Sequence, residues 1–279
     1  MSFTRKEFLH AIGGSALAVI GAAALPKSQA LEKKPAGSTL TLGLASYSVR
    51  NFNLSEVIQM TKRLRLTHLC LKSMHLPLDS SDEHLKSVAK IVKDAGLELY
   101  GAGVIYMRNE AEVHQAFHYA KLAGMKVIVG VPNHELLDLV EEKVKEYDII
   151  VAIHNHGPGD ELYPSPESVY MKIKDRDARL GLCIDIGHTE RIKQNCSEQT
   201  RRFADRLYDI HLKDVDVRGE PGKSVELGSG VIDIPEFIKT LLDINYKGVV
   251  SLEYEKDPDD PLPGMAESVG YTRGILDML

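Results

Sequence analysis

Cysteine is scarce in this chain, and no two cysteines have the spacing of a metal-binding or redox motif. The 279 residues include three cysteines, Cys70, Cys183 and Cys196, and they form no C-x-x-C pair. This absence excludes a zinc ribbon and a thioredoxin-type dithiol. Because Cys70 and Cys183 lie inside apolar runs that are typical of strands, we expect buried thiols and no dependence on disulfides.

An excess of basic residues is also absent. Lys and Arg number 34 and Asp and Glu number 40, which gives a formal net charge of −6. Contacts to phosphate need a basic surface, so we expect no nucleic-acid partner. The charge gives no electrostatic reason for adhesion to an anionic membrane either. With 43% hydrophobic and 27% charged residues, the composition is that of an ordinary globular protein.

The apolar stretch near the N-terminus is too short for a typical membrane span. It covers residues 11–25, whereas a spanning helix needs about 20 apolar residues. Arg5 and Lys6 precede it, and the small-residue string Ser28–Ala30 follows it. This order predicts a signal peptide over residues 1–30, with no stable membrane span after processing. An uncleaved anchor helix is the alternative.

The same segment contains a string that resembles a twin-arginine export motif. It is Thr-Arg-Lys-Glu-Phe-Leu at residues 4–9, with Lys6 in place of the second Arg. The low hydrophobicity of the following stretch also favours this route, and we expect export to the periplasm. Residues 31–38 then form a leader, and residues 39–279 form the folded domain.

Strand-like and helix-like segments alternate through this domain. The strand-like runs are short and continuously apolar, as expected for parallel strands that are covered on both faces. They are residues 40–45, 67–72, 98–102, 126–130, 149–154, 180–185, 207–212 and 248–253. The helix-like segments are residues 55–64, 83–95, 112–123, 134–146, 167–174, 198–204, 235–243 and 265–279. Gly96 and Gly124 are expected to end two of these helices.

Eight such units predict a single (β/α)₈ TIM barrel of the α/β class, preceded by the signal segment. A doubly wound open sheet is the alternative. That fold would place a glycine-rich phosphate loop after the first strand, and residues 46–50, Ser-Tyr-Ser-Val-Arg, contain no glycine.

Four consecutive strands of this predicted barrel end in a side chain that can bind metal. They are His154, Asp185, His211 and Glu253. Neighbouring strand ends meet at the rim of a barrel, so these groups can converge. Two imidazoles and two carboxylates suit Mn²⁺, Co²⁺, Zn²⁺ or Fe²⁺. Such an ion could polarise a sugar carbonyl and stabilise an enediolate.

One ligand has an alternative. If the fifth strand ends two residues later, His156 replaces His154 as the ligand. A single histidine at a strand end is usually a hydrogen-bonded structural residue. Four ligand-type residues in register on successive strands favour a metal site.

Four strings in the chain resemble the sugar phosphate isomerase/epimerase family. They are residues 153–158, 183–189, 209–214 and 248–254. This family is part of the xylose-isomerase-like TIM-barrel superfamily, which also contains ketose 3-epimerases, hydroxypyruvate isomerase, inosose dehydratase and endonuclease IV. The resemblance covers residues 40–279. Endonuclease IV itself is not expected, because its trinuclear site needs more ligands than this chain offers.

The resemblance implies one divalent metal held by a Glu, Asp, His and Glu set. Asp185, His211 and Glu253 match that set, and His154 stands where the family has its first Glu. The implied activity is that of an isomerase or epimerase which acts on a ketose or keto-sugar through an enediolate. Glu253 would be the base, and His156 or Lys213 would take over the acid–base work of the missing carboxylate.

With a histidine at position 154, the chain resembles the inosose-dehydratase-like branch of the family. This favours, as the alternative, a lyase, dehydratase or hydratase that acts on 3-keto-glycosides or inosose-like keto-polyols. A non-catalytic periplasmic sugar-binding protein is the second alternative, from a different class of function.

A small carbohydrate is the partner that the rim residues suggest. Lys72, His75, His188 and Arg218 are predicted to contact substrate hydroxyl and carbonyl groups. Tyr47 and Tyr106 could stack on a sugar ring, although packing is the commoner role for such residues. The sequence allows a homo-oligomer and does not identify the sugar.

Overall fold

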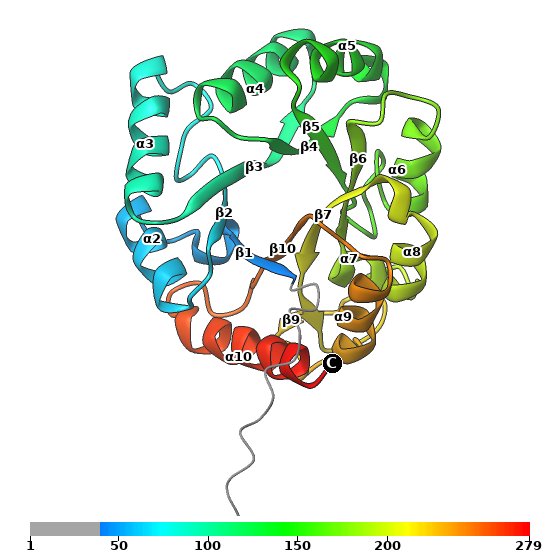
Figure 1. Cartoon of the computed structure of the whole chain (residues 1–279). Helices are drawn as coiled ribbons and strands as arrows, with labels where there is room; N and C mark the ends of the chain where they lie inside the picture. The colour runs from blue at the N-terminus through cyan, green and yellow to red at the C-terminus, as the bar shows by residue number, and fades with distance from the viewer. Residues whose placement is uncertain (1–39) are drawn as a thin grey trace, which may run out of the picture. The chain divides into compact units, whose positions relative to one another are not determined.

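Eight parallel strands close into a barrel with helices around it, as Figure 1 shows. The computed structural model describes residues 40–279, so the predicted signal and leader segments lie outside the described residues. The barrel strands are β1 (Thr41–Ala45), β2 (His68–Leu71), β3 (Glu98–Met107), β4 (Val127–Pro132), β5 (Ile150–His154), β6 (Leu180–Asp185), β7 (Leu207–Leu212) and β10 (Val249–Leu252). Each strand pairs with its neighbours in the chain, and β10 closes the ring onto β1. The predicted (β/α)₈ barrel is confirmed.

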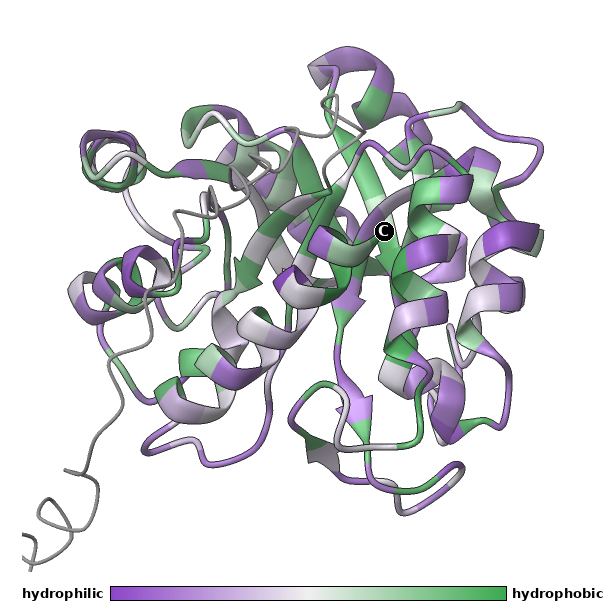
Figure 2. Ribbon diagram, turned by 60° about the horizontal axis from the view of Figure 1, so that its bottom comes forward, coloured by the Kyte–Doolittle hydropathy of each residue, from purple (hydrophilic) through white to green (hydrophobic). Residues whose placement is uncertain are grey.

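Helices cover the outside of the barrel. They are α2 (Leu54–Arg63), α3 (Asp82–Asp94), α4 (Glu110–Leu122), α5 (Leu137–Tyr147), α6 (Pro166–Ile173), α7 (Ile186–Arg191), α8 (Cys196–Arg202), α9 (Ile234–Asp243) and α10 (Leu262–Met278). The strands are the most continuously hydrophobic elements in Figure 2, because both of their faces are covered. Gly96 and Gly124 have φ values of +81° and +69°, which confirms them as residues that end helices.

Several elements depart from the segments expected from the sequence, among them the unexpected helix α7. Strand β3 runs five residues past the predicted end at residue 102, because its pairing with β4 resumes after a register shift between Gly103 and Ile105. The predicted helix 134–146 divides into a 3₁₀ turn, His134–Leu136, and α5. A short hairpin, β8 (Asp214–Val215) and β9 (Ser224–Val225), was not expected.

The loop after this hairpin is organised by one buried carboxylate. Asp214 accepts backbone N–H bonds of 2.8–3.1 Å from four residues. These residues are Val215, Gly228, Gly230 and Ile232. A carboxylate with this many donors fixes the chain between β7 and α9 next to the rim of the barrel.

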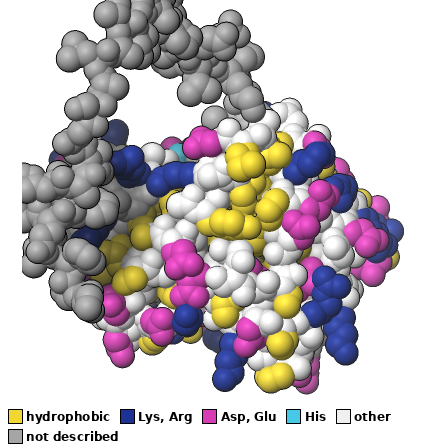
Figure 3. All heavy atoms as spheres, turned by 90° about the horizontal axis from the view of Figure 1, so that it is seen from below, with side chains coloured by type: hydrophobic (Ala, Val, Ile, Leu, Met, Phe, Trp, Pro, Cys, Tyr) yellow, Lys and Arg dark blue, Asp and Glu magenta, His cyan; other side chains and the backbone are white. Residues whose placement is uncertain are grey.

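The outer surface mixes charges of both signs. In the face shown in Figure 3, Lys and Arg side chains lie among Asp and Glu side chains and around a group of apolar atoms. Over residues 40–279, every helix is too short or too polar to cross a membrane.

Candidate metal centre

Four buried ligand-type side chains meet at one end of the barrel. His154 and Asp185 are the last residues of β5 and β6, His211 lies near the end of β7, and Glu253 follows β10. Their exposed fractions are 2%, 0%, 1% and 6%, so bulk water does not solvate them. Their ligand atoms all lie within 4.8 Å of one another. The predicted set therefore converges, with His154 as its member from β5.

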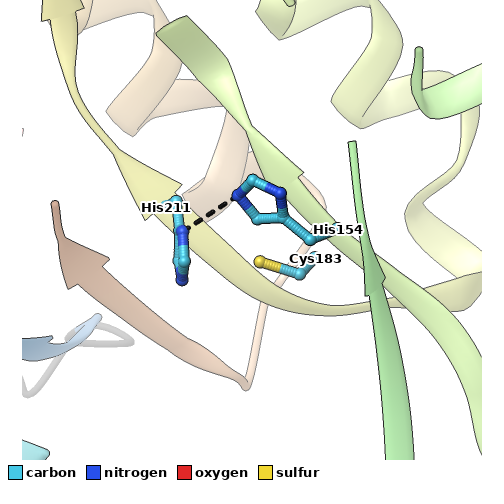
Figure 4. Close-up of side chains that lie close together, drawn as sticks. All are labelled: His154, Cys183 and His211. Atoms are coloured by element: carbon cyan, nitrogen blue, oxygen red, sulfur yellow. Dashed lines mark hydrogen bonds between the residues drawn. The ribbon is translucent and has the colours of Figure 1, made fainter. Parts of the chain in front are cut away.

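Short distances link these groups in a chain. His154 Nε2 lies 3.1 Å from His211 Nδ1, the contact drawn as a dashed line in Figure 4. His211 Nδ1 lies 3.0 Å from Glu253 Oε2. His154 Nε2 lies 3.4 Å from Asp185 Oδ2. This mixed nitrogen and oxygen set has the donor chemistry of a divalent transition-metal site.

The donor set is the observation that tests the fit to a metal. The atoms that face one another, His154 Nε2, His211 Nδ1, Asp185 Oδ2 and Glu253 Oε2, belong to two imidazoles and two carboxylates that are all buried. Such atoms are costly to bury unless another group satisfies them. The residues present fit one divalent ion, to which Asp185, Glu253 and the two imidazoles could all bind.

Asp185 carries out two tasks with its two oxygens. Its Oδ1 accepts a 2.7 Å hydrogen bond from the backbone N–H of His188, so Asp185 is the N-cap of α7. Its Oδ2 faces the site. Asn155 holds the strand end in place, because its side chain accepts a hydrogen bond of 3.1 Å from the Asp185 N–H.

Lys213 is a fully buried cation between the carboxylates. Its Nζ lies 3.0 Å from Asp185 Oδ2, 2.9 Å from Glu253 Oε2 and 3.3 Å from Glu255 Oε2. Burial alone would lower the lysine pKa, but these carboxylates raise it above its ordinary value. Lys213 therefore stays protonated, and it can donate a hydrogen bond or a proton but cannot act as a base at neutral pH.

The same charges keep the carboxyl groups ionised. Burial acts to raise the pKa of Glu253, but the positive charges of His211 and Lys213 hold it well below the ordinary value. Burial likewise opposes ionisation of Asp185, and the positive charge of Lys213 holds its pKa well below the ordinary value. Glu253 is thus available as an ionised base or ligand at neutral pH.

The pKa values of His154 and His211 are shifted in opposite directions. Burial holds the pKa of His154 well below its usual value, so this imidazole is neutral and offers a lone pair. Burial also acts to lower the pKa of His211, but the charge of Glu253 raises it. In Figure 4 the thiol of Cys183, from β6, points toward these two rings.

A cavity of about 230 Å³ opens above the cluster. Its walls come from the ends of several strands and include both aromatic and ionisable side chains. They are Tyr47, Lys72, Val104, Tyr106, His154, His156, His188, Glu253 and Glu255. Drug-sized ligands occupy clefts of about 300–1,000 Å³, so this smaller and more polar cavity suits a single sugar ring.

Besides Glu253, three of the predicted substrate or acid–base residues line this cavity: Lys72, His156 and His188. Lys72 Nζ donates a 2.8 Å hydrogen bond to Val104 O, and burial lowers its pKa. Burial lowers the pKa of His188 to about 4. His156 Nε2 lies 3.2 Å from the hydroxyl of Tyr106, and the two rings are stacked at 5.7 Å.

The structure does not bring His75 into the cavity lining. His75 is buried beneath the loop after β1, where its Nε2 donates to Val49 O at 3.3 Å and Phe52 O at 3.1 Å. Its Nδ1 lies 2.8 Å from the hydroxyl of Ser46. These contacts order the loop that carries Tyr47, one of the cavity residues.

Arg218 also lies outside the cavity lining. Its Nε is 2.7 Å from Glu190 Oε2, and its side chain is half exposed. A role for Arg218 in substrate contact stays a prediction.

Sequence reasoning missed Glu255 and Arg191. Glu255 lines the cavity two residues beyond Glu253, a spacing that returns an extended chain to the same side and could have revealed it. Arg191 ends α7, an element that was not predicted, and its Nη1 lies 3.2 Å from His188 Nδ1. No sequence pattern pointed to that contact.

Family comparison agrees with this geometry. A family model described as a xylose isomerase-like TIM barrel matches residues 69–275. The chain belongs to this family. The match spans β2 through most of α10, so the strand ends that carry the metal-ligand candidates lie within it.

Two curated proteins match part of the chain. The uncharacterized protein MJ1311 of Methanocaldococcus jannaschii is 30% identical over 129 residues, which are 43% of this chain and 42% of that protein. The rhizopine catabolism protein MocC of Rhizobium meliloti is 25% identical over 156 residues, which are 50% of this chain and 46% of that protein. The chain therefore spans less than half the length of these two relatives.

Two solved structures match this chain over nearly their whole length. The IolI protein with a bound zinc atom has a TM-score of 0.71 at 16% identity, covering 86% of this chain and 99% of that one. The 3-keto-D-glucoside 4-epimerase YcjR of E. coli has a TM-score of 0.68 at 15% identity, covering 85% and 100%. These structural similarities show that the chain shares the fold of these two proteins.

Proposed function

We propose that this protein is a divalent-metal-dependent sugar isomerase or epimerase that acts on a ketose or keto-sugar through an enediolate. The observation that carries this proposal is the meeting of His154, Asp185, His211 and Glu253 at the floor of a sugar-sized cavity. Membership of a family that includes sugar isomerases and epimerases supports it, and so does the zinc in the IolI structure.

The four clustered residues would hold the ion. When bound, it would polarise the carbonyl of the substrate and stabilise negative charge on the adjacent oxygens. The two imidazoles favour Zn²⁺, Co²⁺, Fe²⁺ or Mn²⁺ over the oxygen-preferring Mg²⁺ and Ca²⁺.

Glu253 would remove the proton from the carbon beside the carbonyl. Its carboxylate is ionised, buried and part of the cavity wall, which suits a general base. The electron pair of the broken C–H bond moves toward the carbonyl oxygen, and Lys213, whose Nζ lies 2.9 Å from Glu253 Oε2, keeps the base ionised before the transfer. His156, on a different strand end, would return a proton to the substrate.

A lyase that acts on 3-keto-glycosides or inosose-like keto-polyols is the second candidate. The specific observation in its favour is His154, a neutral imidazole where the epimerases carry their first ligand carboxylate. One carboxylate base together with one imidazole acid fits elimination, in which a proton leaves one carbon and an oxygen leaves its neighbour. The 3-keto-glucoside named for YcjR supports keto-glucosides as a substrate class to test.

The deciding experiment combines metal analysis with deuterium incorporation. Gently purified protein is analysed for metal, then incubated in D₂O with Mn²⁺, Co²⁺ or Zn²⁺ and with free ketoses or a 3-keto-glucoside. Deuterium in an intact carbon skeleton supports isomerisation. Release of the aglycone or loss of water supports the lyase. Protein that binds no metal and catalyses neither reaction contradicts both candidates and leaves the sugar-binding alternative.

We further infer that residues 1–30 direct export to the periplasm by a twin-arginine route. The support is the sequence order of a basic region, a mild apolar stretch and a small-residue site. N-terminal sequencing of the protein from a periplasmic fraction tests this. A chain that begins after Ala30 supports it, and a full-length cytoplasmic chain contradicts it.

A further inference from the structure

Arg191 links two residues of the cavity wall, His188 and Glu255, to the turn that carries Gly222. Its Nη1 lies 3.2 Å from Nδ1 of His188, its Nε donates a 2.8 Å hydrogen bond to Gly222 O, and its Nη2 lies 3.9 Å from Glu255 Oε2. The side chain is only 15% exposed. His188 and Glu255 line the cavity, whereas Arg191 does not.

The hydrogen bond between Arg191 and His188 allows only one assignment of donor and acceptor. A guanidinium group carries five N–H donors, no acceptor, and a proton that proteins do not remove. Nδ1 of His188 must therefore accept from Arg191, which requires a lone pair on that nitrogen. An imidazolium ion has no such lone pair, so the ring is neutral and its single proton resides on Nε2.

We propose that Arg191 is a positioning residue that locks His188 in its Nε2–H tautomer, which makes His188 a hydrogen-bond donor to the substrate. Nε2 lies on the side of the metal cluster, 4.0 Å from Asp185 Oδ2. A donor there is matched to a carbonyl oxygen or to the negative oxygen of an enediolate. His188 then does not act as the general base, a role that falls to Glu253. This inference rests on the proposed function.

The position of Arg191 is itself fixed. Gly222, which accepts its Nε–H, lies in a tight turn where an added Cβ would sit 2.6 Å from Val217 O and 3.0 Å from Gly219 O. The Gly222 N–H closes this turn with a 2.9 Å hydrogen bond to Gly219 O. The bond to the Gly222 carbonyl and the place of Arg191 at the end of α7 together limit where the guanidinium can lie.

Binding an anionic substrate is the other common role of a buried arginine. It fits less well here, because Arg191 is not part of the cavity lining and its donors face His188, Gly222 and Glu255. An anion would have to displace all three to reach it.

Nitrogen NMR of the imidazoles tests the tautomer directly. The full-length protein, zinc-loaded and labelled with ¹⁵N-histidine, contains 11 histidines. The signals of His188 are assigned by their loss in His188→Gln. We expect a protonated Nε2 and an unprotonated Nδ1 in the wild type, and a mixture of tautomers in Arg191→Met. A wild-type ring protonated on Nδ1 overturns the proposal.

Enzyme kinetics are the second test of the role of Arg191. We expect Arg191→Met to lower kcat/KM by about 10- to 100-fold, the loss typical when the partner that orients a functional histidine is removed. The loss should fall mainly on kcat, and added guanidinium should restore part of it in Arg191→Ala. Arg202→Met is the matched control, because Arg202 pairs with Glu167 on the outer surface and should keep wild-type kinetics.

The outcomes separate this inference from the proposed function. Equal kinetics for Arg191→Met and Arg202→Met overturn it even if the enzyme is an isomerase. If no keto-sugar is turned over, the proposed function fails, yet the tautomer measurement still decides whether Arg191 sets the proton of His188. Should Arg191→Met fail to fold, Arg191→Gln, whose side-chain amide can accept as well as donate a hydrogen bond and so does not fix the tautomer, takes its place in both tests.

Discussion

The ammonium group of Lys213 lies 2.9 Å from the carboxylate of Glu253, and neither group is open to bulk water. A buried ion pair of this kind holds the charge state of both partners far from their solution behaviour. The proposed base is therefore kept ionised by a neighbouring buried cation.

Replacing Lys213 with Met should move the acid limb of activity to higher pH. Glu253 must be ionised to act as the base, and Lys213 helps to hold its pKa below the ordinary value. Without that positive charge the pKa of Glu253 rises, so activity is lost at a higher pH as the solution is acidified. The measurement is the pH profile of kcat/KM.

The same variant should also lose stability when metal is absent. Removing one partner of a buried pair typically costs about 3–5 kcal/mol, because the other charge is left uncompensated. Lys239→Met, which removes an exposed lysine paired with Asp243 on α9, is the control. An unchanged pH profile in Lys213→Met would mean that Lys213 does not tune Glu253.

Replacing Glu253 with Gln should abolish proton transfer. Loss of a positioned general base typically lowers the rate by about 10²- to 10⁴-fold. The amide oxygen can still bind metal, so deuterium incorporation should fall much further than metal content does. Glu98→Gln, at an exposed residue at the start of β3, is the control. Wild-type exchange in Glu253→Gln would refute the role of Glu253 as base.

Two substitutions can distinguish the roles of the two carboxylate oxygens of Asp185. Asp185→Asn keeps an oxygen that can cap α7 but removes the negative charge that faces the metal. Asp185→Ala removes both and should cost about 1 kcal/mol more through the lost N-cap. Zinc titration should show weakened binding in both variants, and urea unfolding of the metal-free proteins should show the extra loss only in Asp185→Ala. Full zinc affinity in both would exclude Asp185 as a ligand.

Metal should stabilise the folded protein. An ion that binds only the native state at 100 times its Kd adds about 2.7 kcal/mol to the free energy of unfolding. For a domain of this size that corresponds to a rise in Tm of roughly 5–10 °C. Thermal unfolding with Zn²⁺, Co²⁺ or Mn²⁺, and again after a chelator, measures the effect. A Tm that does not respond to any of these ions argues against the site.

Asp209 should make the metal-free protein less stable as the pH rises. Burial raises the pKa of this carboxyl to about 7, and it outweighs the opposite effects of the His211 charge and of the 3.0 Å hydrogen bond that Tyr100 donates. The folded state thus favours the protonated form. The stabilisation is complete below the unfolded pKa of about 4 and is lost as the pH rises through 7, by at most a few kcal/mol.

Asp209→Asn should remove this pH dependence, because an amide does not ionise. Urea unfolding at pH 5 and pH 8 should show the variant gaining stability relative to the wild type at the higher pH. Asp205→Asn, at an exposed position, serves as the control. Parallel pH dependence in Asp209→Asn and the wild type would contradict the assignment.

The metal-ligand candidates were accessible to sequence reasoning because they follow strongly apolar strands. Strands β6 and β7 have the bounds expected for them, and Asp185 and His211 stand at or near their ends. In a closed barrel, consecutive strand ends are neighbours, so the order of residues along the chain predicts their convergence. Only the ligand on the fifth strand had an alternative, and His154, the last residue of β5, is the histidine that lies in the cluster.

The residues that surround the cluster could not be predicted in the same way. Arg191 lies on a six-residue helix, which has too little periodicity to detect. His75 lies three residues past Lys72, but a tight turn directs its ring into the loop after β1 and away from the cavity. Loop conformation depends on contacts with distant segments, such as the bond from Arg191 to Gly222, which local sequence does not encode.

Asp185 connects the start of α7 to the metal cluster through a single carboxyl group. Ion binding at one of its oxygens and helix capping at the other are therefore thermodynamically linked. If ion binding favours the ordered form of α7 by a given factor, the ordered form of α7 binds the ion more tightly by the same factor. A change at the far end of this helix can thus alter occupancy of the centre without touching any ligand.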